Sequence, residues 1–141
     1  MPDWERRLTE VGYRVTMPRR AVMEALVAAE VPLQPHEIRE RAQTSHRRLG
    51  LVTVYRTLAL LMELDLVRRV HREDGCHGYL LTTPGHRHAL ICQCCARAIE
   101  FAGGDDISAL IQRVEAQTGY RVEEHLLQLF GQCPDCQAKA E

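Results

Sequence analysis

The chain has 141 residues and nearly balanced charge, with 18 basic against 19 acidic residues, but its two halves differ. Residues 1–72 carry 13 arginines against 9 acids, a net charge of +4, and residues 73–141 carry 5 basic groups against 10 acids, a net charge of −5. No apolar run approaches the ~20 residues of a membrane span, and the first residues lack a secretory signal, which excludes a membrane protein and predicts a cytoplasmic one. We therefore expect two small domains, of which the first contacts an anion.

The first half predicts a series of helices. Residues 3–11 are expected to form a short helix, and Thr16 is expected to cap a second helix that runs to Ala29. Pro35 opens a further helix. The last helix spans 52–64, and its apolar spacing predicts a buried side formed by Val54, Leu58, Leu61 and Met62. Three short helices in succession after the first indicate a helix-turn-helix unit.

Two extended segments follow the helices, residues 66–71 and 78–81, and the Asp74-Gly75 pair between them predicts a hairpin. A hairpin after a helix-turn-helix unit makes a winged helix. Residues 82–85 break the regular pattern and are interpreted as the connection to a second domain. The predicted organisation is a winged-helix domain at 1–82, a hinge at 83–86 and a second domain at 87–141.

The second domain is predicted to be α/β. Residues 89–92 and 97–101 are expected to be strands, 106–118 a helix, and 120–130 a long strand. A unit of about 55 residues has a marginal core of its own. We therefore expect a metal and a partner subunit to stabilise it.

Two Cys-x-x-Cys pairs in the second half point to that metal. Each pair can present two thiolates to one ion, and together Cys92, Cys95, Cys133 and Cys136 can complete a closed tetrahedral zinc site. The 37 residues between the pairs, 96–132, exceed the spacing of a zinc ribbon, so secondary structure must join them. The alternative is a redox-active or disulfide-forming set of thiols.

The start of the last predicted helix carries side chains suited to DNA. Thr53, Tyr55 and Arg56 lie where a recognition helix meets base edges in the major groove. Further arginines are placed to flank them on phosphates: Arg14, Arg19 and Arg20. The alternative is that these are solvated surface charges.

The chain resembles the ferric uptake regulator (Fur) superfamily of bacterial metalloregulators over nearly its whole length. The resemblance rests on the order and spacing of five segments: TVYRTL (53–58), HRHALICQCC (86–95), IEF (99–101), TGY (118–120) with His125, and GQCPDC (131–136). It implies an N-terminal winged helix, a C-terminal α/β dimerisation domain, and a homodimer that binds double-stranded operator DNA under the control of a metal at the hinge. It implies neither a membrane nor a small-molecule substrate.

Departures from the family pattern bear on the metal. Iron- and peroxide-sensing members usually carry histidines where this chain has 31–33 and Ala89. The hairpin instead offers a thiol, and sulfur favours zinc. The chain therefore resembles the zinc uptake regulators, which implies a repressor of zinc uptake genes with both structural and regulatory zinc. The regulatory ligands are predicted among Cys76, His77, His86, His88, Glu100, His125 and Asp106, and how they divide between two sites is left open.

Besides a zinc-stabilised interaction module that binds no duplex, three alternatives are weighed against zinc sensing. The first is an iron-, manganese- or peroxide-sensing member of the same family, and the second is a repressor that senses thiol oxidation. The third is a zinc enzyme such as a deaminase, which needs His-x-Glu with Pro-Cys-x-x-Cys downstream. The Pro-Cys-x-x-Cys string does not occur in this sequence, and neither His86 nor His88 is followed two residues later by glutamate. A closed four-cysteine site also has no open position for water. We therefore expect no catalytic activity.

Overall fold

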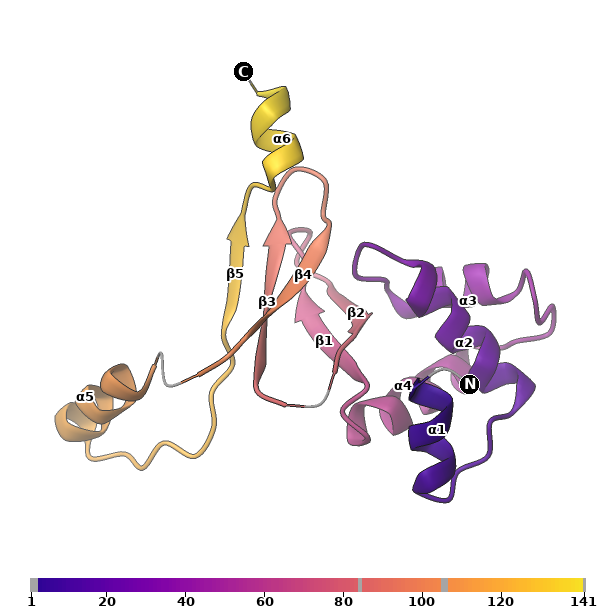
Figure 1. The fold of residues 1–141 in the computed structure, drawn as a ribbon, viewed down its shortest axis with the longest axis horizontal. Helices are drawn as coiled ribbons and strands as arrows, with labels where there is room; N and C mark the ends of the chain where they lie inside the picture. Colours follow the sequence, from indigo (N-terminus) through magenta and orange to yellow (C-terminus); the bar gives the residue numbers. More distant parts are fainter. Residues whose placement is uncertain (1–2, 84, 105–106, 141) are drawn as a thin grey trace.

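The computed structural model describes residues 3–83, 85–104 and 107–140. Four helices form a cluster at one end, a two-stranded hairpin lies in the middle, and a three-stranded sheet with a short C-terminal helix lies beyond it (Figure 1). The helices of the cluster are α1 (Asp3–Glu10), α2 (Met17–Ala28), α3 (Pro35–Ala42) and α4 (Leu51–Glu63). This order confirms the predicted winged-helix unit followed by an α/β unit.

Local sequence signals explain where the helices begin. Thr16 caps α2, because its side chain accepts a hydrogen bond from the Arg19 backbone N–H at 3.3 Å. At α3, Gln34 and Glu37 form a capping box, in which the Gln34 backbone N–H donates to the Glu37 carboxylate at 2.8 Å. Both helices carry a proline in the first turn, where the missing N–H is not needed.

The apolar faces of these helices make the main core of the molecule. Val54, Leu58 and Leu61 of α4 are fully buried as predicted, and they pack with residues of α1, α2 and α3. Met62 is the exception, because its side chain is 37% exposed. A helix turns by about 100° per residue, which carries Met62 away from the stripe that ends at Leu61.

The wing consists of β1 (Val67–His71) and β2 (His77–Leu81), paired antiparallel with His71 opposite His77. Gly75 takes φ +83° in the connecting turn, a conformation that favours glycine. An isolated bridge between Leu33 and Tyr79 joins the wing to the loop before α3. The predicted hairpin is therefore confirmed, and it is attached to the helices.

The second sheet has the order β4-β3-β5, with β3 at Arg87–Cys92, β4 at Ala98–Ala102 and β5 at Gln128–Gly131. β3 pairs antiparallel with β4 and parallel with β5. The prediction of a strand over 120–130 is wrong for most of its length, since residues 120–127 form no strand. Only the last part of that segment lies beside β3, where it finds a hydrogen-bonding partner.

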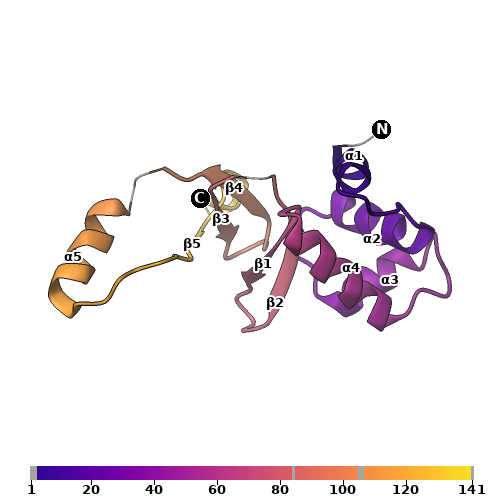
Figure 2. The ribbon, with the colours of Figure 1, turned by 90° about the horizontal axis from the view of Figure 1, so that it is seen from below.

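Helix α5 (Ser108–Thr118) stands away from the sheet, as both views show (Figures 1 and 2). It contains no buried residue among those described, although Leu110 is an apolar residue that is 47% exposed. The prediction started this helix at Asp106, which lies outside the described residues. Helix α6 (Pro134–Lys139) ends the chain, and no helix in the described ranges is long and apolar enough to cross a membrane.

The wing packs directly on the second sheet. Val70 of β1 forms a buried cluster with Ala89 and Ile91 of β3. The Gln128 side chain of β5 makes two hydrogen bonds to the backbone of His71, donating to its carbonyl oxygen at 2.6 Å and accepting from its N–H at 3.0 Å. The winged-helix unit and the sheet therefore contact each other directly through their own side chains and backbone.

Candidate metal centres

The four cysteines of the two Cys-x-x-Cys pairs meet at one end of the sheet. Cys92 ends β3 and Cys95 lies in the turn that follows, while Cys133 caps α6 and Cys136 lies within it. The parallel register opposes Cys92 to Gly131, which places the second pair beside the first. The sequence analysis required secondary structure to join the two Cys-x-x-Cys pairs, and the parallel pairing of β3 and β5 supplies it.

The spacing of the sulfur atoms fits zinc. The Sγ atoms of Cys92 and Cys136 are 3.8 Å apart, and so are those of Cys95 and Cys133. A tetrahedron with Zn–S bonds of about 2.3 Å has edges of about 3.8 Å. Cys94 lies outside this group, exposed, with its sulfur accepting a hydrogen bond from the Gln132 amide at 3.5 Å.

Hydrogen bonds from the backbone prepare the cluster for a cation. The Cys133 N–H donates to the Cys92 sulfur at 3.3 Å, and this bond, with others from Cys95 and Cys94, lowers the pKa of Cys92 to about 5. The pKa of Cys136 is raised, first because its thiol is hydrogen-bonded to Cys133 and then by burial. Four sulfurs in contact cannot all be thiolates without a positive charge between them, and a zinc ion supplies that charge.

A second cluster consists of three histidines on the opposite side of the domain from the cysteines. His86 and His88 lie at the start of β3, two residues apart, where side chains of a strand share a face. His125 comes from the segment before β5, and its Nε2 is 2.7 Å from Nε2 of His86. The ligand nitrogens of all three lie within 4.8 Å of one another. Imidazole nitrogens at this separation can hold a zinc, iron or related divalent ion.

Gly103 forms the wall of the three-histidine cluster, and the sequence analysis did not single it out. Its N–H donates to the His86 carbonyl at 2.7 Å. A Cβ at this position would lie 2.8 Å from the His86 ring and 2.8 Å from Nε2 of His88, closer than real contacts allow. The signal available in the sequence was the glycine pair at 103–104, directly after a predicted strand.

We expect Gly103→Ala to weaken metal binding at the three-histidine cluster by about tenfold, because the added methyl group displaces two ligand rings. The measurement is a competition titration of the second metal against a chelator. Gly50→Ala is the matched control, since a Cβ there meets nothing within 4 Å. Equal affinities of the two variants would contradict the expectation.

The remaining predicted ligands lie elsewhere. Cys76 is exposed in the wing turn, and the ring of His77 contacts that of His71, with centroids 4.8 Å apart. Glu100 pairs in register with Ala89, so it lies on the sheet face that meets the wing, whereas His88 lies on the other face. Among the described residues neither Cys76, His77 nor Glu100 joins a metal cluster, and Asp106 is outside them. The structure therefore assembles part of the predicted set, His86, His88 and His125.

The predicted DNA-contacting side chains of α4 lie on its open surface. Tyr55 is 51% exposed, Arg56 is exposed, and Thr53 is half-buried. The buried stripe of the helix faces the core, so this exposed side is the one that a groove of DNA can reach. Contact of these residues with DNA stays a prediction.

The three flanking arginines differ in their surroundings. Arg14 is exposed, and Arg19 donates to the Arg14 carbonyl at 2.7 Å while its guanidinium lies over the Tyr13 ring. Arg20 is paired with Glu5, a buried carboxylate of α1. Arg20 therefore has a structural partner, and phosphate contact by Arg14 and Arg19 stays a prediction.

A winged helix packed on a small α/β domain with a four-cysteine cluster and a three-histidine cluster defines a metal-binding transcriptional regulator. The chain belongs to the ferric uptake regulator family, whose pattern it matches over residues 10–130. Family members regulate transcription and are not enzymes, so this chain is a DNA-binding metalloregulator.

Individual relatives cover almost the full chain. The ferric uptake regulation protein of Escherichia coli K12 is 32% identical over 136 residues, 96% of this chain and 91% of that protein. The structure of holo XcZur matches with a TM-score of 0.74 and 26% identity, covering 96% of this chain and 94% of the other. A zinc uptake regulator complexed with zinc and DNA matches with a TM-score of 0.78 and 19% identity, covering 97% and 93%.

Proposed function

We propose that this chain is a zinc-responsive transcriptional repressor that binds operator DNA as a metal-loaded dimer and shuts off zinc uptake genes. The observation that carries the proposal is the presence of two separate clusters, one of four sulfurs sized for zinc and one of three imidazoles. A closed four-sulfur site suits a permanent structural ion. The three-histidine cluster, whose two exposed members are His86 and His125, suits an exchangeable one.

The three histidines connect two parts of the second domain. His88 belongs to β3 and His86 lies one residue before that strand, whereas His125 belongs to the segment that joins α5 to β5. A cation held by all three supplies a cross-link between these parts. The likeness to two zinc uptake regulator structures supports zinc as that cation, since zinc accepts neutral imidazole ligands.

An exposed apolar surface on the same segment supports a dimer. Large side chains around α5 and β5 are open to solvent: Leu110, Tyr120, Leu126, Leu129 and Phe130. So many large apolar side chains open to solvent on a small domain favour an interaction site. A second copy of this chain is the partner we propose, because a two-fold dimer presents two α4 helices to two half-sites about 34 Å apart.

The test is a titration of DNA binding with metals. The probe is a duplex selected from random sequence by the zinc-loaded protein, and filling the second site with zinc is expected to raise affinity for it by roughly 5–150-fold. The control variant Arg56→Ala should keep two zinc ions per chain and lose DNA affinity. Absence of any response to zinc would contradict the proposal.

The second candidate is an iron-responsive regulator, which the 32% identity to the Escherichia coli ferric uptake regulation protein favours. Both metals accept imidazole, so the same duplex is titrated with Fe²⁺ and Mn²⁺ without oxygen. Activation by iron at a lower free concentration than zinc would select this candidate.

A further inference from the structure

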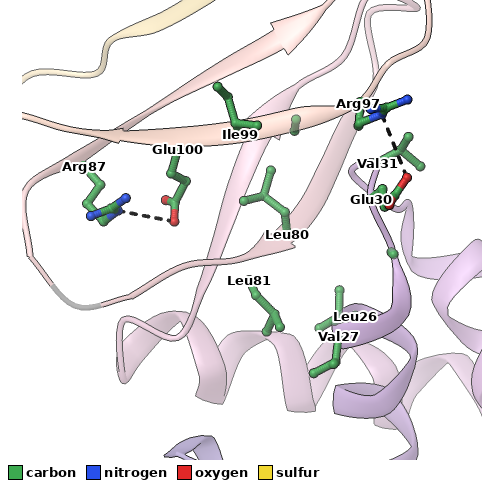
Figure 3. A pocket seen from close by; sticks show the side chains of 12 residues that line it. Leu26, Val27, Glu30, Val31, Leu80, Leu81, Arg87, Arg97, Ile99 and Glu100 are labelled. Atoms are coloured by element: carbon green, nitrogen blue, oxygen red, sulfur yellow. Dashed lines mark ion pairs between the residues drawn. The ribbon is translucent and has the colours of Figure 1, made fainter. Parts of the chain in front are cut away.

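Glu100 lies at the interface between the wing and the second sheet, and its side chain is only 12% exposed. One carboxylate oxygen accepts a hydrogen bond from the Thr82 hydroxyl at 2.5 Å and lies 3.5 Å from Nε of Arg68. The other oxygen lies 3.6 Å from Nε of Arg87. Figure 3 shows Glu100 and Arg87 pointing toward each other at the edge of a pocket of about 420 Å³ between the sheet, β2 and α2.

The three partners of Glu100 come from three parts of the chain. Arg68 belongs to β1 of the wing, Thr82 to the connection after β2, and Arg87 to β3 of the sheet. One acidic side chain of the sheet thus forms an ion pair with the wing, accepts a hydrogen bond from the connection and forms a second ion pair within its own sheet. The contacts with Arg68 and Thr82 must break for the wing to separate from the sheet.

Two guanidinium groups neutralise this one carboxylate. An arginine keeps its charge at any pH the protein meets, so neither partner leaves by losing a proton. A metal ion at Glu100 would lie beside two fixed positive charges, which disfavour it. Arg68 and Arg87 therefore supply the positive charge that a metal ion would otherwise supply to this carboxylate.

Other contacts across the same interface also need no metal. Val70 and the half-buried Leu80 of the wing pack on Ala89 and Ile91. Two hydrogen bonds from the Gln128 side chain hold the end of β1 at its other side. Polar and apolar contacts together hold the wing against the sheet.

We propose that Glu100 is a positioning residue, not a metal ligand: its ion pair with Arg68 and its hydrogen bond from Thr82 hold the wing on the sheet independently of metal, while Arg87 helps to neutralise its charge. The regulatory metal then acts on the segment that carries His125 and not on the orientation of the wing. This inference concerns how the proposed regulation works, so the DNA-binding experiments that test it rest on the proposed function. The structural experiment, which compares the wing and sheet with and without the second metal, does not.

The structural experiment uses the full-length wild-type protein. Zinc per chain is counted, and small-angle X-ray scattering is recorded with two ions bound and after a chelator has removed the second ion alone. The oligomeric state is measured in parallel and used in fitting both scattering curves. We expect both curves to fit the same arrangement of wing and sheet within each subunit. A separation of the wing from the sheet on loss of the second ion would overturn the proposal.

The variant Glu100→Gln keeps the shape of the side chain and removes its charge. We expect it to retain two zinc ions per chain and to bind the selected duplex about tenfold more weakly, since it leaves partly buried arginines without a counter-charge. Loss of one zinc ion would identify Glu100 as a ligand and overturn the proposal, while leaving zinc regulation in place.

A double-mutant cycle shows whether Arg68 and Glu100 act through their shared contact or whether each substitution merely destabilises the protein. Arg68→Gln should weaken DNA binding to a similar degree, and the double variant with Glu100→Gln should bind no more weakly than either single variant. Arg69→Gln is the matched control, because Arg69 is the exposed neighbour on β1 whose side chain points to the other face. Its effect should add to that of Glu100→Gln. Additive effects of Arg68→Gln and Glu100→Gln on DNA binding would overturn the proposed role of Glu100. A wild-type protein whose DNA binding does not respond to zinc would contradict only the zinc-regulation proposal.

Discussion

Replacing Cys133 with serine is expected to remove the structural zinc and to unfold the sheet domain. Structural zinc contributes about 10–16 kcal/mol of apparent binding free energy in small domains. The sheet itself buries few apolar side chains, and its own cluster consists of Ala89 and Ile91 with Val70 of the wing. Cys133 follows β5 and Cys92 ends β3, so loss of the Cys133 thiolate removes the metal link between the ends of these two strands. Elemental analysis and thermal unfolding followed by circular dichroism measure the result.

Cys94→Ser is the matched control for this experiment. Cys94 lies between the first two ligands in sequence, yet it is exposed and outside the cluster. It should retain the zinc and the wild-type melting temperature within about 1–2 °C, because surface substitutions change stability by only about 0.5 kcal/mol. The winged-helix core should survive in both variants, since it packs without the sheet. Zinc retained by Cys133→Ser would contradict the four-cysteine assignment.

His125→Ala is expected to remove the second metal and the response of DNA binding to zinc. His125 supplies the one ligand of the cluster that comes from neither β3 nor the residue directly before it, and its Nε2 is 2.7 Å from that of His86. Only His86 and His88 would remain, and two histidines bind zinc far more weakly than three converging ligands. We expect the zinc count to fall from two to one per chain and most of the roughly 5–150-fold activation to disappear.

Cys76→Ala tests the alternative set of ligands that the sequence analysis proposed. The thiol is exposed in the wing turn and joins neither cluster of the described residues. We therefore expect this variant to keep two zinc ions and a normal response. If Cys76→Ala loses the second ion and His125→Ala keeps it, the sensory site lies in the wing and not at the histidines.

Much of the fold was predictable because its signals are local. Thr16 and Pro35 mark helix starts through side-chain capping and a missing N–H, and Gly75 marks the hairpin through its left-handed conformation. The segment at 120–130 was predicted incorrectly for the opposite reason. Its alternating residues suit a strand, but a strand also needs a neighbour, and only 128–131 find one beside β3.

The site was predictable to a different degree for each cluster. Two Cys-x-x-Cys pairs carry their geometry in their spacing, because each pair already presents two sulfurs. The histidine cluster needs His125, which is 37 positions beyond His88 and lies outside any strand. Glu100 was predicted as a ligand together with the histidines. Pairing with Ala89 in the register of β3 and β4 puts Glu100 on the face toward the wing and not beside His88, which the sequence did not indicate.

The sequence by itself determined the family, the order of the two units, the four clustered cysteines and the buried side of the last helix before the wing, because these depend on local composition and short spacings. Only the tertiary structure decided which histidines converge, which side chains of the sheet face the wing, and which charges meet there. The physical reason is that side chains on strands alternate between two faces and that pairing partners lie far apart in the chain. A shift of one residue in register exchanges the faces, and no short stretch of sequence records that choice.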